Sequence, residues 1–462
     1  MLDGHVVPCR HGQAKERHIL KPTTEASRIF FGLSSFQALA MFRRGIFYTF
    51  LAVYLRSYLG LSVTETTLFE TIPMVLNVLF QTLLWGRLTD RLQLRRSLII
   101  TGELLASIGH VAMWYFHSLA PDPRSAGFVI IAGLTVIEVF WSMSNIGWSA
   151  FISDVYTTEQ RNAIQGKFAS IGGAGRIAGA MLGGILYDGM RMAYPGWGFK
   201  AGGIFFVSAF VMAISVVPLL FIPEGGIHYR KQSSTAGNTG ETTVAAGKLG
   251  LFAVFLVAML MINSGINILG AFRAQYLDLA EGFAASPRAI SLVVNVESAV
   301  LIAIGFFLGA LGRKIGIRKL LVLGTASGIV SMLLHAMAPL MGLIYLAAAF
   351  KGMSDGCIVS SSYAYASTLI PPEKRGRYFA WYNATFFLSW GLAATFLSGP
   401  LIDRLIDAGR GAVFAYKAGL LSGAALMTLG LCLLGFLFRA SKRQKISRET
   451  IRQVGSPSSG AE

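Results

Sequence analysis

Twelve stretches of about 20 mostly apolar residues, each bounded by charges, Pro or Gly, run through this chain of 462 residues. Wound as an α-helix, such a stretch crosses about 30 Å of hydrocarbon. The stretches are too long for strands and lack alternation of period two, which argues against a transmembrane barrel. Charged residues make up only 14% of the chain, against about 25% in an average soluble domain. The sequence therefore predicts an all-α polytopic membrane protein and excludes soluble, fibrous and disordered classes.

The predicted spans form two groups of six, separated by a polar Gly/Ser/Thr-rich segment. This segment, residues 223–248, is typical of a flexible linker. We expect an N-tail at 1–28, a six-helix bundle at 29–222, the linker, a second bundle at 249–438 and a basic C-tail at 439–462. No cleavable signal peptide is expected, because the opening residues are polar. The spans are 33–56, 66–86, 97–118, 127–152, 164–187, 201–222, 250–272, 289–311, 319–338, 342–366, 377–402 and 415–438.

The basic residues are distributed unequally between the two sides of the predicted membrane. With both termini cytoplasmic, the cytoplasmic segments hold 27 Lys and Arg residues and the opposite loops hold 9, among them Arg273. Positive residues are retained on the cytoplasmic side of a membrane, so we expect cytoplasmic N and C termini. The net charge of +17 then reflects topology and contact with anionic lipid, and no nucleic-acid partner is expected.

Two pairs of matching segments indicate an internal duplication. The loop GRLTDRLQLRR (Gly86–Arg96) is similar to GALGRKIGIRK (Gly309–Lys319). SDVYTTEQR, which starts at residue 153, is similar to STLIPPEKR, which starts at residue 367, and each leads into a span that ends in GGILYD or SGPLID. Duplicated six-helix halves are common among secondary transporters.

The first of these loops resembles the GxLaDRxGRRxxL signature of the major facilitator superfamily, with Gln93 in place of the usual Gly. The resemblance extends over essentially the whole chain and implies two pseudo-symmetric six-helix bundles. It also implies a conformational latch, in which the signature carboxylate stabilises a helix N-terminus and the arginines bind carboxylates or helix-end carbonyls. The alternative is that the arginines only enforce topology. The latch residues are Gly86, Asp90, Arg91, Arg95, Arg96 and Arg318.

Ionisable residues deep inside the spans are the main functional signal, since each costs about 2.5–3.5 kcal/mol on insertion scales. In the superfamily that the chain resembles, the first, fourth, seventh and tenth spans line the central cavity. Five of the seven deep ionisable residues fall on three of those spans, and the seventh span supplies two asparagines. The predicted substrate and coupling-ion residues are Arg43, Arg44, Glu138, Arg176, Asn263, Asn267, Glu297, Lys351 and Asp355.

Structural alternatives stay open for several of these residues. Arg43 and Arg44 point about 100° apart on a helix, so the two are not expected to face one cavity, and one of them can pair with Glu138 instead. Lys351 and Asp355 are spaced i, i+4 and can neutralise each other. Glu297 lies off the cavity-lining set and is either a proton carrier or a packing partner. Glu70 and Glu103 lie nearer the ends of their spans, where they are expected to reach water.

Small and aromatic residues carry weaker signals. Gly175, Gly179 and Gly183 recur every four residues and predict close helix packing. They also resemble the GxxxGPxxGG antiporter signature of the superfamily, with Ala180 in place of Pro. Several aromatic residues either wall a substrate pocket or form an interfacial belt: Phe140, Trp141, Trp148, Trp381 and Trp390. His5, Cys9, His11 and His18 match no zinc pattern, so no metal site is predicted.

No phosphate-binding loop or catalytic constellation is present, so we expect no enzyme and no cofactor. The function hypothesis is a secondary transporter of a small solute, coupled to protons through Glu138. Three arginines in the spans of the first half favour an anionic or zwitterionic solute, whereas export of lipophilic cations stays open. A non-transporting sensor or assembly factor of the same fold is the alternative of another class. A monomer in a bacterial inner membrane is expected.

Overall fold

The computed structural model describes residues 24–156, 158–226, 247–370 and 375–454. The described residues are almost entirely helical and contain no strand. Most of the predicted N-tail and linker, the end of the predicted C-tail and the Asp90 side chain lie outside the described part. Within the described residues, eleven helices are long and apolar enough to cross a membrane, and the remaining predicted span is assembled from shorter helices. The chain is therefore an all-α, multi-pass membrane protein of twelve spans.

The first half begins with α1 (Thr24–Val53), which continues into a π-helical turn at Tyr54–Tyr58. The second span consists of α2 (Val63–Phe80), a π-helical turn at Gln81–Trp85 and α3 (Gly86–Leu92). The other elements are α4 (Arg95–Ser118), α5 (Pro123–Val155), α6 (Thr158–Tyr187), the short α7 (Trp197–Lys200), α8 (Gly203–Ser215) and the 3₁₀ turn η3 (Val217–Phe221).

The second half repeats this arrangement, with one span broken. The eleventh span consists of α14 (Arg375–Leu388), a π-helical turn η5 (Ala394–Ser398) and α15 (Gly399–Asp407), separated by a break around Trp390. The other helices are α10 (Gly247–Asp278), α11 (Pro287–Ile315), α12 (Ile317–Met337), α13 (Met341–Leu369) and α16 (Ala412–Val454).

Local sequence explains where several helices begin. The Ser62 side chain accepts a hydrogen bond from the Glu65 amide at 3.1 Å, and the Glu65 carboxylate accepts from the Ser62 amide at 2.8 Å, so α2 starts with a capping box. Asp122 caps α5, and its hydrogen bonds from Ser125 hold the pKa of the Asp122 carboxyl below its usual value. Each cap satisfies backbone donors that a helix cannot pair internally.

The repeated loop differs in one respect from the sequence prediction. Residues 86–92 continue the second span as α3, so the expected loop shrinks to Gln93 and Leu94. Gln93 adopts a left-handed conformation with φ of 57°, and Gly316 in the second copy has φ of 87°. A residue with a side chain is strained in this conformation, which is why glycine suits the position that Gln93 occupies.

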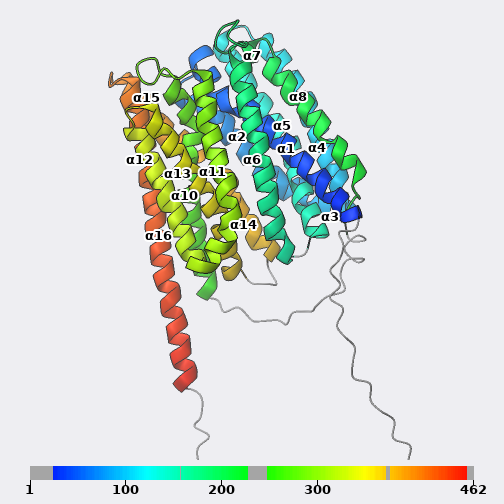
Figure 1. Ribbon diagram of the computed structural model, residues 1–462, viewed down its shortest axis with the longest axis vertical. Coiled ribbons are helices and arrows are strands. Elements are labelled where there is room, and N and C mark those ends of the chain that lie inside the picture. Colours follow the sequence, from blue (N-terminus) through cyan, green and yellow to red (C-terminus); the bar gives the residue numbers. More distant parts are fainter. Residues whose placement is uncertain (1–23, 157, 227–246, 371–374, 455–462) are drawn as a thin grey trace, which may run out of the picture.

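Figure 1 shows the helices standing side by side with two distinct ends. We call the end that carries the start of α1 and the end of α16 the terminal end, and the end that carries α7 and α15 the loop end. The helices overrun two predicted boundaries at the terminal end: α1 begins at Thr24, and α16 continues to Val454.

The two halves are bonded to each other toward the loop end. The Asp403 carboxylate accepts hydrogen bonds from the amides of Val63 and Thr64 at 2.9 and 2.8 Å, across the two halves. Thr395 bonds to Thr67 and Thr71 at 2.6 Å each. Among hydrogen bonds whose two partners are both described, every one that joins the halves lies between the loop end and the middle of the bundle.

Candidate functional site

The guanidinium of Arg44 lies between aromatic rings of both halves. It is 5.2 Å from the ring centroid of Trp141 on α5 and 4.4 Å from that of Trp390, which follows α14. Arg43, the next residue along α1, is 5.6 Å from the same Trp141 ring. Both arginines thus contact one indole although they point in different directions, and Arg44 links the first half to the second at mid-depth.

The expected ion pair between one of these arginines and Glu138 is absent from the described part of the chain. The Glu138 carboxylate instead accepts a hydrogen bond at 2.5 Å from Asn77, whose own oxygen accepts from Gln81 at 2.7 Å. Arg43 is 3% exposed, and its Nε atom has no hydrogen-bond partner among the described residues. This alternative is not realised, because α2 places an amide against Glu138 and the arginines stack on indoles instead.

Glu103 does not reach water as expected, and Glu70 is half-buried. Glu103 is 1% exposed and accepts a hydrogen bond from Ser144 at 2.8 Å, because α4 packs closely along α5. One oxygen of Glu70 is buried without a described partner, on the side of α2 that faces α10. Both lie within electrostatic range of the α1 arginines, Glu70 of Arg44 and Glu103 of Arg43. The centre of the first half therefore holds more carboxylates than the sequence indicated.

Glu297 lies at the centre of a charge network that joins the halves. Its carboxylate oxygens accept from Arg176 on α6 at 3.0 Å and from Arg273 on α10 at 2.6 Å. Lys351 on α13 approaches the same carboxylate at 4.0 Å. Glu297 is 2% exposed and has cations from three helices around it, although its helix lies off the expected cavity-lining set.

Arg273 is a site residue that the sequence prediction missed. It was assigned to an external loop, but α10 continues to Asp278 and leaves Arg273 only 7% exposed. Glu297 was the signal that could have found it, because a deep carboxylate requires cationic partners. Asn77 was missed as well, and its position in the middle of a span was the corresponding clue.

Lys351 and Asp355 form the ion pair that their i, i+4 spacing allows, with Nζ 2.6 Å from Oδ2. Because Lys351 also approaches Glu297, the pair belongs to the larger network. On α10, Asn263 is 7% exposed, and Asn267 donates a hydrogen bond to Ser389 at 3.0 Å, next to the break in the eleventh span. Asn267 therefore borders the same region as Trp390.

The predicted latch residues bond within their own halves. Arg95 is 3.0 Å from the Asp154 carboxylate, and Arg96 is 3.2 Å from that of Glu224. Arg318 donates to Ser441 at 3.0 Å, and Arg91 is exposed on α3, which begins at Gly86. No described latch residue forms a hydrogen bond or ion pair with a described residue of the opposite half.

The three spaced glycines of α6 pack directly against α1. A Cβ atom at Gly175 or Gly179 would collide with the carbonyl oxygens of Ala38 or Phe42, and one at Gly183 would lie 2.8 Å from that of Ile46. This close approach holds Arg43 and Arg44 beside Arg176. The N-terminal residues His5, Cys9, His11 and His18 lie outside the described part of the chain.

Most of the chain, from residue 33 to residue 457, matches one family of known proteins. The Major Facilitator Superfamily matches residues 33–394 and, in a second match, residues 250–457. The chain belongs to the Major Facilitator Superfamily. It is a membrane transporter, not an enzyme.

Among curated proteins of known name, this superfamily member is 23% identical over 257 residues to "Multidrug resistance protein 2" of Bacillus subtilis (strain 168). The match includes 53% of this chain and 57% of that protein, so the chain spans little more than half the length of the relative.

Solved transporter structures share the fold over nearly their whole length. A bacterial homolog of the human lysosomal transporter Spinster, inward-facing and unoccupied, has a TM-score of 0.66 at 13% identity, with 90% of this chain and 98% of that chain covered. The nucleoside transporter NupG has a TM-score of 0.67 at 15% identity, with 89% and 100% covered. A peptide transporter POT has a TM-score of 0.66 at 16% identity, with 89% and 94% covered. At these identities the likeness establishes the fold alone.

Proposed function

We propose that this superfamily member is a proton-coupled secondary transporter of a small organic anion or zwitterion, working by alternating access. The observation that carries the proposal is the position of Arg44, whose guanidinium stacks between indoles of the two halves. Neither Arg44 nor Arg43 forms an ion pair within 4 Å among the described residues.

A buried cation is retained in a membrane protein when it has a partner or binds a ligand. The planar guanidinium donates parallel hydrogen bonds that match a carboxylate or phosphate, and the stacked indoles hold it in place. Trp390 adds a buried indole N–H that has no described partner. A bound anion would therefore accept hydrogen bonds from both halves at once. A ligand that contacts both halves stabilises the state in which they close around it.

The orientation follows from charge. We place the terminal end, where the basic segments lie, in the cytoplasm of a bacterial inner membrane. Hydrogen bonds then join the halves on the external side, and the described latch residues bond only within their halves. Both observations support an inward-facing state. We propose that the transporting unit is a monomer. The Spinster homolog that shares the fold is likewise titled inward-facing.

Glu138 is the proposed coupling carboxylate. It is 4% exposed, it accepts from Asn77 rather than from an arginine, and it lies within electrostatic range of Arg44 and Arg43. A proton on Glu138 and an anion on Arg44 would each change the charge that the other experiences. Through such coupling, a proton gradient can drive transport of the anion across the membrane.

Thermal unfolding of the purified protein across a panel of organic anions, amino acids, sugars and lipophilic cations tests the proposal. A ligand that binds the folded state raises the apparent Tm by mass action. We expect a shift with anions or zwitterions that is lost in Arg44→Ala. The matched control is Arg124→Ala, which removes a charge whose side chain is 65% exposed at the loop end. An anion-induced shift that survives in Arg44→Ala contradicts the assigned site.

Export of lipophilic cations is the second candidate. The name of the Bacillus subtilis relative favours it, as do the buried carboxylates Glu103 and Glu138 and the half-buried Glu70. In the same panel, a shift with lipophilic cations alone, lost in Glu138→Gln and retained in Arg44→Ala, would replace the anion proposal with this one.

A further inference from the structure

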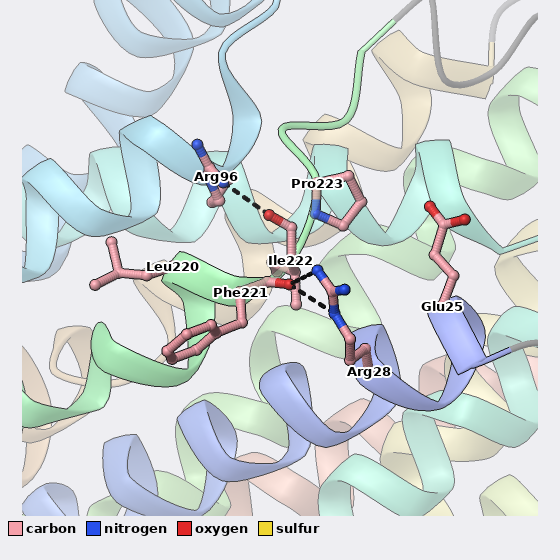
Figure 2. A pocket seen from close by; sticks show the side chains of 7 residues that line it. All are labelled: Glu25, Arg28, Arg96, Leu220, Phe221, Ile222 and Pro223. Carbon is pink, nitrogen blue, oxygen red and sulfur yellow. Dashed lines mark hydrogen bonds between the residues drawn. The ribbon is translucent and has the colours of Figure 1, made fainter.

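A cavity lies at the terminal end of the first half, away from the central site. It has a volume of about 390 Å³ and is formed by the first turn of α1, the start of α4 and the end of η3. Figure 2 shows Arg28 and Arg96 approaching two successive backbone carbonyls from different helices. No residue of this cavity takes part in the charge networks around Arg44 or Glu297.

The backbone holds both guanidinium groups in place. Arg28 donates from Nε and Nη2 to the carbonyl oxygen of Phe221, at 3.1 and 2.6 Å. Arg96 donates from Nη1 to the carbonyl oxygen of Ile222 at 2.8 Å. A guanidinium has five N–H donors, so each arginine keeps donors for a further acceptor. This geometry resembles a prepared anion site more than a flexible surface side chain.

The ionisable residues that line the cavity are Arg28, Arg96 and Glu25. Arg96 lies 3.2 Å from the Glu224 carboxylate, whereas Arg28 forms no ion pair within 4 Å among the described residues. Glu25 also lines the cavity but does not come within ion-pair distance of Arg28. Arg28 therefore has no direct ion pair among the described residues, although the Glu25 carboxylate lines the same cavity.

Exposed apolar side chains border the arginines. Phe31 on α1 is 69% exposed, and Leu220 and Phe221 on η3 are 54% and 63% exposed. In a chain that crosses the membrane twelve times, such side chains at the outer surface of the bundle contact acyl chains. The cavity thus places cations directly beside a lipid-facing apolar surface, near the ends of the first and sixth spans.

We propose that this cavity binds an anionic glycerophospholipid, with the phosphate on Arg28 and Arg96 and the acyl chains along Phe31, Leu220 and Phe221. A basic pocket between spans beside a membrane surface suits an anionic headgroup, and each arginine near the surface adds about 1 kcal/mol, or about five-fold in affinity. A free phosphate would use the arginines and leave the apolar border unused. A lipid here would tie the first, third and sixth spans together.

Native mass spectrometry of the purified full chain in detergent tests the proposal, with phosphatidylglycerol and phosphatidylcholine of matched acyl chains as probes. We expect phosphatidylglycerol to bind at least five-fold more tightly. Arg28→Gln should weaken that binding about five-fold. Arg313→Gln is the matched control, since it removes the same charge from an exposed side chain at the same end. Equal losses in the two variants would indicate non-specific charge attraction and overturn the site.

Two further measurements distinguish a lipid phosphate from a free phosphate at this cavity. If inorganic phosphate displaces phosphatidylglycerol at equal concentration, the site takes a free anion and the lipid proposal fails. A photoactivatable phosphatidylglycerol should label the peptide that contains residues 217–223 in the unmodified protein, which requires no variant to fold. Labelling confined to other segments overturns the proposal. Neither result depends on the substrate assigned to Arg44.

Discussion

Replacing Glu297 with Gln is expected to destabilise the protein strongly, because that carboxylate neutralises cations from three helices. It accepts from Arg273 at 2.6 Å and from Arg176 at 3.0 Å, and Lys351 lies 4.0 Å away. Glu297→Gln keeps the shape of the side chain and removes its charge. Asp355 alone would then face the three cations.

The magnitude follows from the burial of the network. Removing one partner of a buried ion pair costs about 3–5 kcal/mol, since the other charge stays buried and uncompensated. Glu297 and Arg273 are 2% and 7% exposed, so solvent screens them little. We therefore expect Glu297→Gln to lower the free energy of unfolding by about 3–5 kcal/mol.

Equilibrium unfolding in mixed detergent micelles, followed by tryptophan fluorescence, measures this change. The matched control is Glu281→Gln, an exposed carboxylate in the loop after α10, which should change the free energy of unfolding by less than about 0.5 kcal/mol. The double variant Glu297→Gln, Arg176→Gln should be less destabilised than the sum of the two single variants, by about 0.5–3 kcal/mol. If Glu297→Gln is no more destabilising than Glu281→Gln, the network does not stabilise this state and the reasoning is refuted.

Three other predictions concern packing, gating and coupling. Gly179→Ala places a methyl group against the carbonyl oxygen of Phe42 and should destabilise the protein by about 1–3 kcal/mol in the same unfolding assay, whereas Gly250→Ala, which meets open space, should not. Asp403→Ala removes the cap that the second half supplies to α2, about 0.5–2 kcal/mol, and should increase the reactivity of cysteines introduced at the loop end; unchanged reactivity would show that the cap does not hold the halves together. Glu138→Gln should abolish uphill accumulation in proteoliposomes while retaining substrate exchange, and uphill transport that persists removes Glu138 from coupling.

The sequence alone was sufficient to predict the architecture. Hydrocarbon solvates no backbone polar group, so each crossing must be a helix of about 20 apolar residues, and such stretches are legible in the sequence. The similarity between Gly86–Arg96 and Gly309–Lys319 indicated the duplicated halves, because a repeated loop is visible in the sequence itself. The ionisable residues inside the spans also indicated which helices carry the candidate site, since a charge deep in the membrane is costly on any face of a helix.

The partners of those charges were decided by tertiary structure. Glu297 meets Arg176, 121 residues away, because α11 packs on α6, and it meets Arg273 because α10 runs farther than hydropathy indicates. Arg44 stacks on indoles rather than pairing with Glu138, since Asn77 occupies that carboxylate. Hydropathy measures how deep a residue lies, but the rotation of each helix about its axis depends on packing against its neighbours. That rotation determines which charges meet.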